Sequence, residues 1–116
     1  MNEVIITNNP LVEKEYKRGF SVELKDTDLL GVLLHVRDLI HKGYELLTHP
    51  LSGSIKPNET LYKTVLLRKN NKTDFQSVEI IEKCIETVKK FPPKQIGQNH
   101  LHDMQTVDLE HIKTAM

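Results

Sequence analysis

The sequence predicts an α/β fold in which a small, mostly parallel four-stranded sheet is flanked by helices in three layers. Three observations predict it. A β-branched apolar run at residues 3–7 ends at an Asn-Asn-Pro turn. Two later stretches carry apolar residues at helical spacing. The resulting order is strand, helix, strand, helix, strand, loop, strand and helix, which is typical of Rossmann-like or flavodoxin-like topologies.

The first half of the chain begins with a short helix and a second strand after residues 3–7. Pro10 suits the first turn of that helix, and Gly19 closes it. Residues 20–24 alternate between apolar and polar, as in a half-exposed strand. Asp26 or Thr27 is expected to cap the next helix. The apolar face of this helix consists of Leu29, Leu30, Leu33, Val36, Leu39 and Ile40.

The second half supplies two strands, at residues 44–48 and 64–67, and a second amphipathic helix. Pro92-Pro93 stops that helix, so residues 1–92 are expected to form one domain. Residues 93–116 form a C-terminal tail in which 104–113 can make a short helix. The buried stripe of the amphipathic helix consists of Val78, Ile81, Cys84 or Ile85, Val88 and Phe91.

This order of elements indicates where a ligand would bind. If the strand order begins 2-1-3, the first and third strands are neighbours and the chain reverses direction between them. Ligands of such sheets bind at the carboxyl ends of the strands beside that reversal. The segments that leave these ends are residues 7–10 and 48–54. We therefore expect the two segments to converge on one site.

Composition excludes several classes of function. The chain has 16 basic and 16 acidic residues, and no run of like charge exceeds a Lys-Lys pair. Nucleic acid and anionic lipid are therefore not expected as partners. The longest apolar run is far shorter than a membrane span, and the start of the chain lacks a basic leader. We expect a cytoplasmic protein, in which the single cysteine, Cys84, is a buried and inert thiol.

The candidate site consists of the two strand-end segments. The connection at residues 48–62 is long for a compact domain, and it is rich in hydroxyl groups. Its Ser-Gly-Ser amides together with a lysine can cradle an anion. The alternative is an Ω-loop that satisfies its own backbone, beside an Asn-Asn-Pro turn with ordinary capping chemistry. The candidate ligand-binding residues are Thr7, Asn8, Asn9, Thr48, His49, Ser52, Gly53, Ser54, Lys56, Asn58, Glu59 and Thr60.

Catalytic and metal sites are weakly supported. His49 lies near Ser52 and Glu59 in sequence, but the loop lacks a nucleophile-elbow pattern. The glycine and lysine spacings match no Walker loop or dinucleotide fingerprint, so no cofactor is expected. The segment 100–103 has two histidines and an aspartate, and His111 follows. Zinc needs three or four ligands with supporting contacts, so incidental surface residues are the better interpretation.

Four segments resemble the GrdX family. They are residues 6–11 (ITNNPL), 36–43 (VRDLIHKG), 47–60 (LTHPLSGSIKPNET) and 81–87 (IEKCIET). The resemblance covers residues 1 to about 92 and is most specific in the central segments. It implies a cytoplasmic accessory of the glycine, sarcosine or betaine reductase system of anaerobic amino-acid-fermenting bacteria. The family carries no assigned activity, so the resemblance implies no catalytic residues.

Three hypotheses follow. The first is an accessory or regulatory protein that binds a reductase component or a small anion through the strand-end loops. The second is a small enzyme for a phosphorylated or carboxylate substrate, with His49 as acid or base and Lys56 binding the anion. The third is a non-catalytic scaffold that forms a homodimer through its tail.

Overall fold

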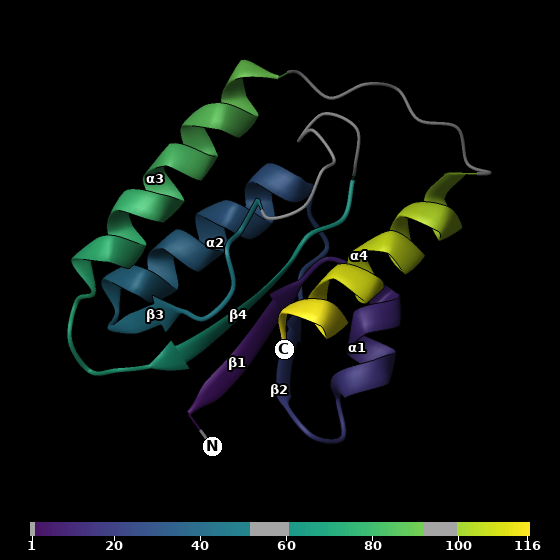
Figure 1. Ribbon diagram of the computed structural model, residues 1–116, viewed down its shortest axis with the longest axis horizontal. Coiled ribbons are helices and arrows are strands. Elements are labelled where there is room, and N and C mark those ends of the chain that lie inside the picture. The colour runs from purple at the N-terminus through teal and green to yellow at the C-terminus, as the bar shows by residue number, and fades with distance from the viewer. Residues whose placement is uncertain (1, 52–60, 92–99) are drawn as a thin grey trace.

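The computed structural model describes residues 2–51, 61–91 and 100–116, and the described part contains four strands and four helices (Figure 1). The predicted α/β class is confirmed. In chain order the elements are β1 (Glu3–Thr7), α1 (Pro10–Tyr16), β2 (Ser21–Leu24), α2 (Leu29–His41), β3 (Tyr44–Leu46), β4 (Thr64–Lys69), α3 (Phe75–Lys90) and α4 (Leu101–Ala115).

The sheet has the order β2-β1-β4-β3 and is mostly antiparallel, so the expected parallel sheet was wrong. Only β1 and β2 pair in parallel, whereas β4 lies antiparallel to both β1 and β3. The physical reason lies in the connection between β3 and β4. A parallel return needs a crossover, usually a helix, but residues 48–62 have no helical periodicity. The chain therefore returns antiparallel, and β4 separates β1 from β3.

The insertion of β4 still leaves three strand ends at one edge of the sheet. Because β1 and β3 both run antiparallel to β4, they point in the same direction, and β2 follows β1. The carboxyl ends of β1, β2 and β3 therefore lie at the edge where β4 begins. In the register of β1 and β4, Thr7 at the end of one strand pairs with Thr64 at the start of the other.

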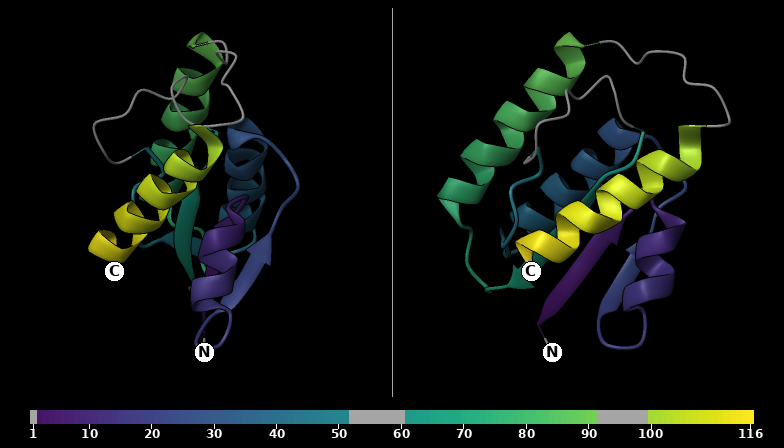
Figure 2. Two further views of the ribbon diagram at one scale, coloured as in Figure 1. Left: turned by 90° about the vertical axis from the view of Figure 1, so that its right-hand side faces the viewer. Right: turned by 45° about the vertical axis from the view of Figure 1, so that its right-hand side comes forward.

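Helices cover both faces of the sheet, with α2 and α3 on one face and α1 and α4 on the other (Figure 2). Successive side chains of β1 point alternately to these two faces. Val4 and Ile6 pack in the α2–α3 core, whereas Ile5 packs with Val12 of α1 and Ile112 of α4. The sheet is thus buried on both faces, which explains why the middle of β1, residues 4–6, is apolar on both sides.

Local details depart from the sequence expectations at two helix ends. Asp28 caps α2, in place of the expected Asp26 or Thr27, because its Oδ1 accepts a hydrogen bond from the Gly31 amide at 2.8 Å. Phe91, expected on the buried stripe of α3, is the C-cap residue and is 39% exposed. Among the described residues, no helix combines the length and apolar character needed to cross a bilayer.

Candidate functional site

Asn8 ties three segments together just beyond the end of β1. Its side-chain Nδ2 donates to the Thr27 carbonyl at 3.0 Å and to the Leu61 carbonyl at 2.8 Å. Its Oδ1 accepts from the Lys63 amide at 2.9 Å. The side-chain amide that the sequence suggested as a ligand contact therefore holds the segment after β2 and the segment before β4 beside the end of β1.

The neighbouring polar residues form a buried chain of hydrogen bonds that ends at Asp108 of α4. The Asn9 side chain donates to Asp108 Oδ2 at 3.0 Å and to the Gln105 carbonyl at 2.9 Å. Thr64 donates to the same Oδ2 at 2.7 Å. Since the Thr64 hydroxyl has one proton, Thr7, 2.7 Å away, must donate to Thr64. The backbone amide of Asn9 donates to Thr7 Oγ1 at 3.0 Å and completes the chain of hydrogen bonds.

Asn9 therefore acts as a structural residue. Its Oδ1 accepts from the Leu11 amide at 3.0 Å and caps α1, while its Nδ2 anchors α4. Asn9 and Thr7 are both fully buried. Asn9 shows the capping chemistry of the alternative interpretation, and Thr7 is bonded to Thr64 and to the Asn9 backbone amide.

Lys63 and Cys84 lie near this network. Lys63 is buried, and burial lowers the pKa of its ammonium, while Asp108, and Cys84 when it is ionised, act in the opposite direction. Burial also raises the pKa of the Cys84 thiol, which Lys63 and the Leu51 backbone partly oppose. The thiol is 3% exposed and belongs to the α2–α3 core. Cys84 is therefore protonated and shielded, as expected for an inert thiol.

Thr48 and His49 follow β3 and also make internal contacts. Thr48 Oγ1 accepts from the Leu66 amide at 3.0 Å, and His49 Nδ1 accepts from the Leu51 amide at 3.1 Å. The other predicted residues of this loop, Ser52, Gly53, Ser54, Lys56, Asn58, Glu59 and Thr60, lie outside the described residues.

A small hollow lies beside Thr48 and His49, and it also touches Lys63, Asp108 and His111. Its volume is about 10 Å³, which is room for about one water molecule. This hollow cannot hold a metabolite. Within residues 2–51, 61–91 and 100–116, no three His, Cys, Asp or Glu side chains gather closely enough to hold a metal ion.

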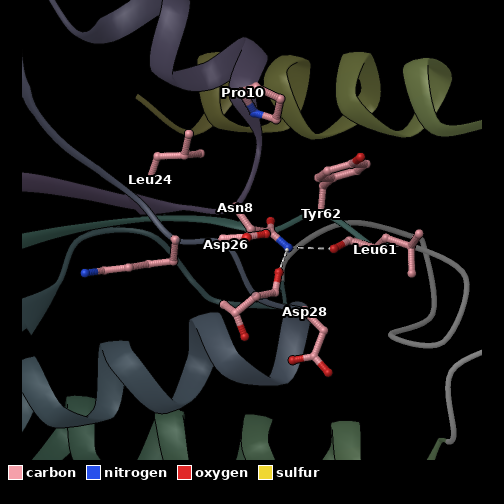
Figure 3. A pocket seen from close by; sticks show the side chains of 9 residues that line it. Asn8, Pro10, Leu24, Asp26, Asp28, Leu61 and Tyr62 are labelled. Carbon is pink, nitrogen blue, oxygen red and sulfur yellow. Dashed lines mark hydrogen bonds between the residues drawn. The ribbon is translucent and has the colours of Figure 1, made fainter.

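A much larger pocket lies at the carboxyl ends of β1 and β2 (Figure 3). Its volume is about 560 Å³, within the usual range for small-ligand sites. We call it the strand-end pocket. It is lined by Asn8, Pro10, Leu24, Lys25, Asp26, Thr27, Asp28, Leu61 and Tyr62.

Both apolar and charged groups contribute to the strand-end pocket. Leu24 is 41% exposed and contributes apolar surface to the pocket. Tyr62 contributes an aromatic ring, and its hydroxyl accepts a hydrogen bond from Gln105 Nε2 of α4 at 2.9 Å. Asp26 and Asp28 are exposed carboxylates. Figure 3 shows Asp28 at the start of α2, with Pro10 and Tyr62 on the side toward α4.

Sequence reasoning found one edge of this pocket and missed most of its lining. It singled out Asn8, which the structure places in the lining, but paired the end of β1 with that of β3. In the structure, β2 supplies the strand end that lines the pocket beside the end of β1, and this end carries Leu24 and the Asp-Thr-Asp run. The sequence could have indicated this part of the lining. The second strand lies beside the first in the predicted order, and polar residues follow it.

The comparisons with known proteins give one result. No curated protein and no solved structure matches the chain. The family model described as "GrdX-like protein" matches residues 4–116, which extends the resemblance through α4. The chain therefore belongs to the GrdX-like protein family.

Proposed function

We propose that this GrdX-like protein is an accessory binding protein of the glycine, sarcosine or betaine reductase system, and that it contacts a reductase component through the strand-end pocket. Membership of the family supports the connection to the reductase system. The pocket supports a binding role. Its volume of about 560 Å³ and its exposed Leu24 together are the observation that carries the proposal.

The chemistry of the lining suits binding better than catalysis. The described lining has apolar side chains from Pro10, Leu24 and Leu61, two carboxylates and one ammonium group, but no imidazole or thiol. Such a mixture resembles a protein-interaction surface, with an apolar centre and a charged rim. The enzyme alternative depends on His49, which is not among the lining residues and whose Nδ1 already accepts a backbone hydrogen bond.

The scaffold alternative is also less well supported. Its homodimer would form through the C-terminal tail, yet α4 packs against the chain's own sheet. Ile112 is 3% exposed in the core between α1 and the sheet, and Asp108 is bonded to Asn9 and Thr64. The apolar side of α4 is therefore already used within the chain.

The test uses purified reductase components and a pair of matched variants. Leu24→Arg places a bulky cation in the pocket, whereas Phe75→Arg makes the same kind of change at an exposed residue (77%) at the start of α3. Each protein is immobilised, and binding of each component is measured by biolayer interferometry. We expect the unchanged protein and Phe75→Arg to bind equally, and Leu24→Arg to bind about tenfold or more weakly.

Two results would contradict the proposal. One is that no reductase component binds the unchanged protein. The other is that both variants bind as well as the unchanged protein, which would place the interface elsewhere. Circular dichroism and urea unfolding of both variants check that neither change disrupts the fold.

A further inference from the structure

We infer that the strand-end pocket takes a positively charged group, an ammonium or guanidinium, carried on an aliphatic stem. The inference deepens the proposed function, because it rests on the same pocket and names the chemistry of its occupant. It differs from the anion expected from the sequence, whose proposed cradle lies in the 48–62 connection.

The charge of the lining favours a cation. Asp26 and Asp28 contribute two carboxylates, against the single ammonium of Lys25. That ammonium lies 3.2 Å from Glu23 Oε1, so its charge is already matched by a carboxylate that is not in the lining. Asp26 and Asp28 therefore give the described lining a net negative charge, although one oxygen of Asp28 also caps α2. Both are exposed, so a ligand can reach them without crossing the core.

The N-terminus of α2 does not reverse this preference. A helix N-terminus attracts anions through its free amides and its dipole. Here Asp28 already occupies that place, since its Oδ1 accepts from the Gly31 amide at 2.8 Å. An incoming anion would therefore meet a carboxylate in place of a free amide.

The side-chain amide of Asn8 already donates both of its N–H groups within the chain. Its Nδ2 donates to the carbonyl groups of Thr27 and Leu61. It therefore has no further N–H to offer to a carboxylate or phosphate group in the pocket. An anion would find few donors among the side chains that the structure describes here.

The apolar part of the lining suits an aliphatic stem. Pro10, Leu24 and Leu61 offer carbon surface in the same pocket as the carboxylates, and Figure 3 shows Leu24 and Leu61 on different sides of the view. Lysine and arginine side chains bury such stems while the charged head stays near polar groups. The ring of Tyr62 adds a surface over which a cation can also bind.

The experiment titrates ¹⁵N-labelled protein with probes of matched length. The cationic probes are agmatine and cadaverine, 1-pentanol is the neutral control, and glutarate is the anionic control. We expect saturable amide shifts at Leu24, Thr27 and Leu61 with the cations and much weaker shifts with the controls. If glutarate binds more tightly than agmatine, or if no cation shifts these amides at millimolar concentration, the inference is wrong.

Charge-neutral variants locate the effect. We expect the double variant Asp26→Asn, Asp28→Asn to weaken agmatine binding by about tenfold, since each exposed ion pair contributes up to about fivefold. Asparagine caps helices as well as aspartate does, so α2 is preserved. Asp38→Asn removes an equal charge from α2, about 15 Å further along the helix, and should leave binding unchanged. Equal weakening by Asp38→Asn would contradict a local site.

A comparison of two peptides identifies the source of the cation. An arginine peptide with flanking leucines is compared with the same peptide carrying neutral citrulline. Tighter binding of the arginine peptide than of the citrulline peptide and of agmatine points to a partner chain. Equal affinity for the arginine peptide and for agmatine points to a free metabolite. Either result supports the inference. Loss of reductase binding in Leu24→Arg without any cation binding would retain the proposed function and overturn the inference alone.

Discussion

Replacement of Asp108 tests how the C-terminal helix is held on the domain. The carboxylate is 5% exposed and accepts hydrogen bonds from Asn9 at 3.0 Å and Thr64 at 2.7 Å. Hydrogen bonds to a charged group contribute about 1.5–3 kcal/mol each, and breaking a buried charge interaction costs about 3–5 kcal/mol. Because Asp108 also favours the charged form of buried Lys63, we expect Asp108→Ala to lower the free energy of unfolding by about 3–5 kcal/mol.

The measurement is urea unfolding followed by circular dichroism. At a slope of about 2 kcal/mol/M, the midpoint for Asp108→Ala should fall by about 2 M. Asp108→Asn keeps the shape of the side chain and one acceptor oxygen, so the free energy of unfolding should fall by about half as much. Asp103→Ala, in the exposed first turn of the same helix, is the control and should cost less than about 1 kcal/mol. Equal losses for Asp103→Ala and Asp108→Ala would refute the buried anchor.

The remaining predictions concern the strand ends and the core thiol. Asn8→Ala should lower stability by about 2–3 kcal/mol in urea unfolding, because three backbone groups lose their partner; an unchanged midpoint would contradict that role. Gly31→Ala should perturb the Thr27 amide in NMR spectra, because the new Cβ would lie 1.8 Å from Thr27 Oγ1, and an unmoved amide would contradict it. Cys84 should react with a thiol reagent only after unfolding. Since its folded pKa is raised, the unfolded chain loses the proton first above pH 9.0. Stability should therefore fall there relative to Cys84→Ala, and parallel pH profiles would contradict the raised pKa of the thiol.

Sequence patterns predicted the elements better than their arrangement. The helical spacing of the apolar residues predicted α2 and α3, and Leu33, Val36 and Ile40 of the predicted face are fully buried. The direction of β4 was not predicted correctly. Strand periodicity is the same in parallel and antiparallel pairs, so direction depends on the connection. The sequence pattern of residues 48–62 showed a loop without a helix, which favours the antiparallel return found here.

The hydrogen-bond partners of the candidate residues were not predicted, for a similar reason. Asn8 and Asn9 were singled out because they follow a strand, and both lie at the predicted edge of the sheet. Their hydrogen bonds reach Leu61 and Gln105, which are far away in sequence. No local pattern can show whether an amide faces a ligand or a distant backbone carbonyl. The lining of the strand-end pocket likewise depends on which strand lies beside β1.

A photo-crosslinker in the strand-end pocket tests the central claim most directly. With Leu24 replaced by p-benzoylphenylalanine, irradiation beside purified reductase components should crosslink one component, and agmatine should suppress the product. The same replacement at Phe75, the exposed control, should give little product. Equal crosslinking from both positions, or no product from position 24, would contradict the account.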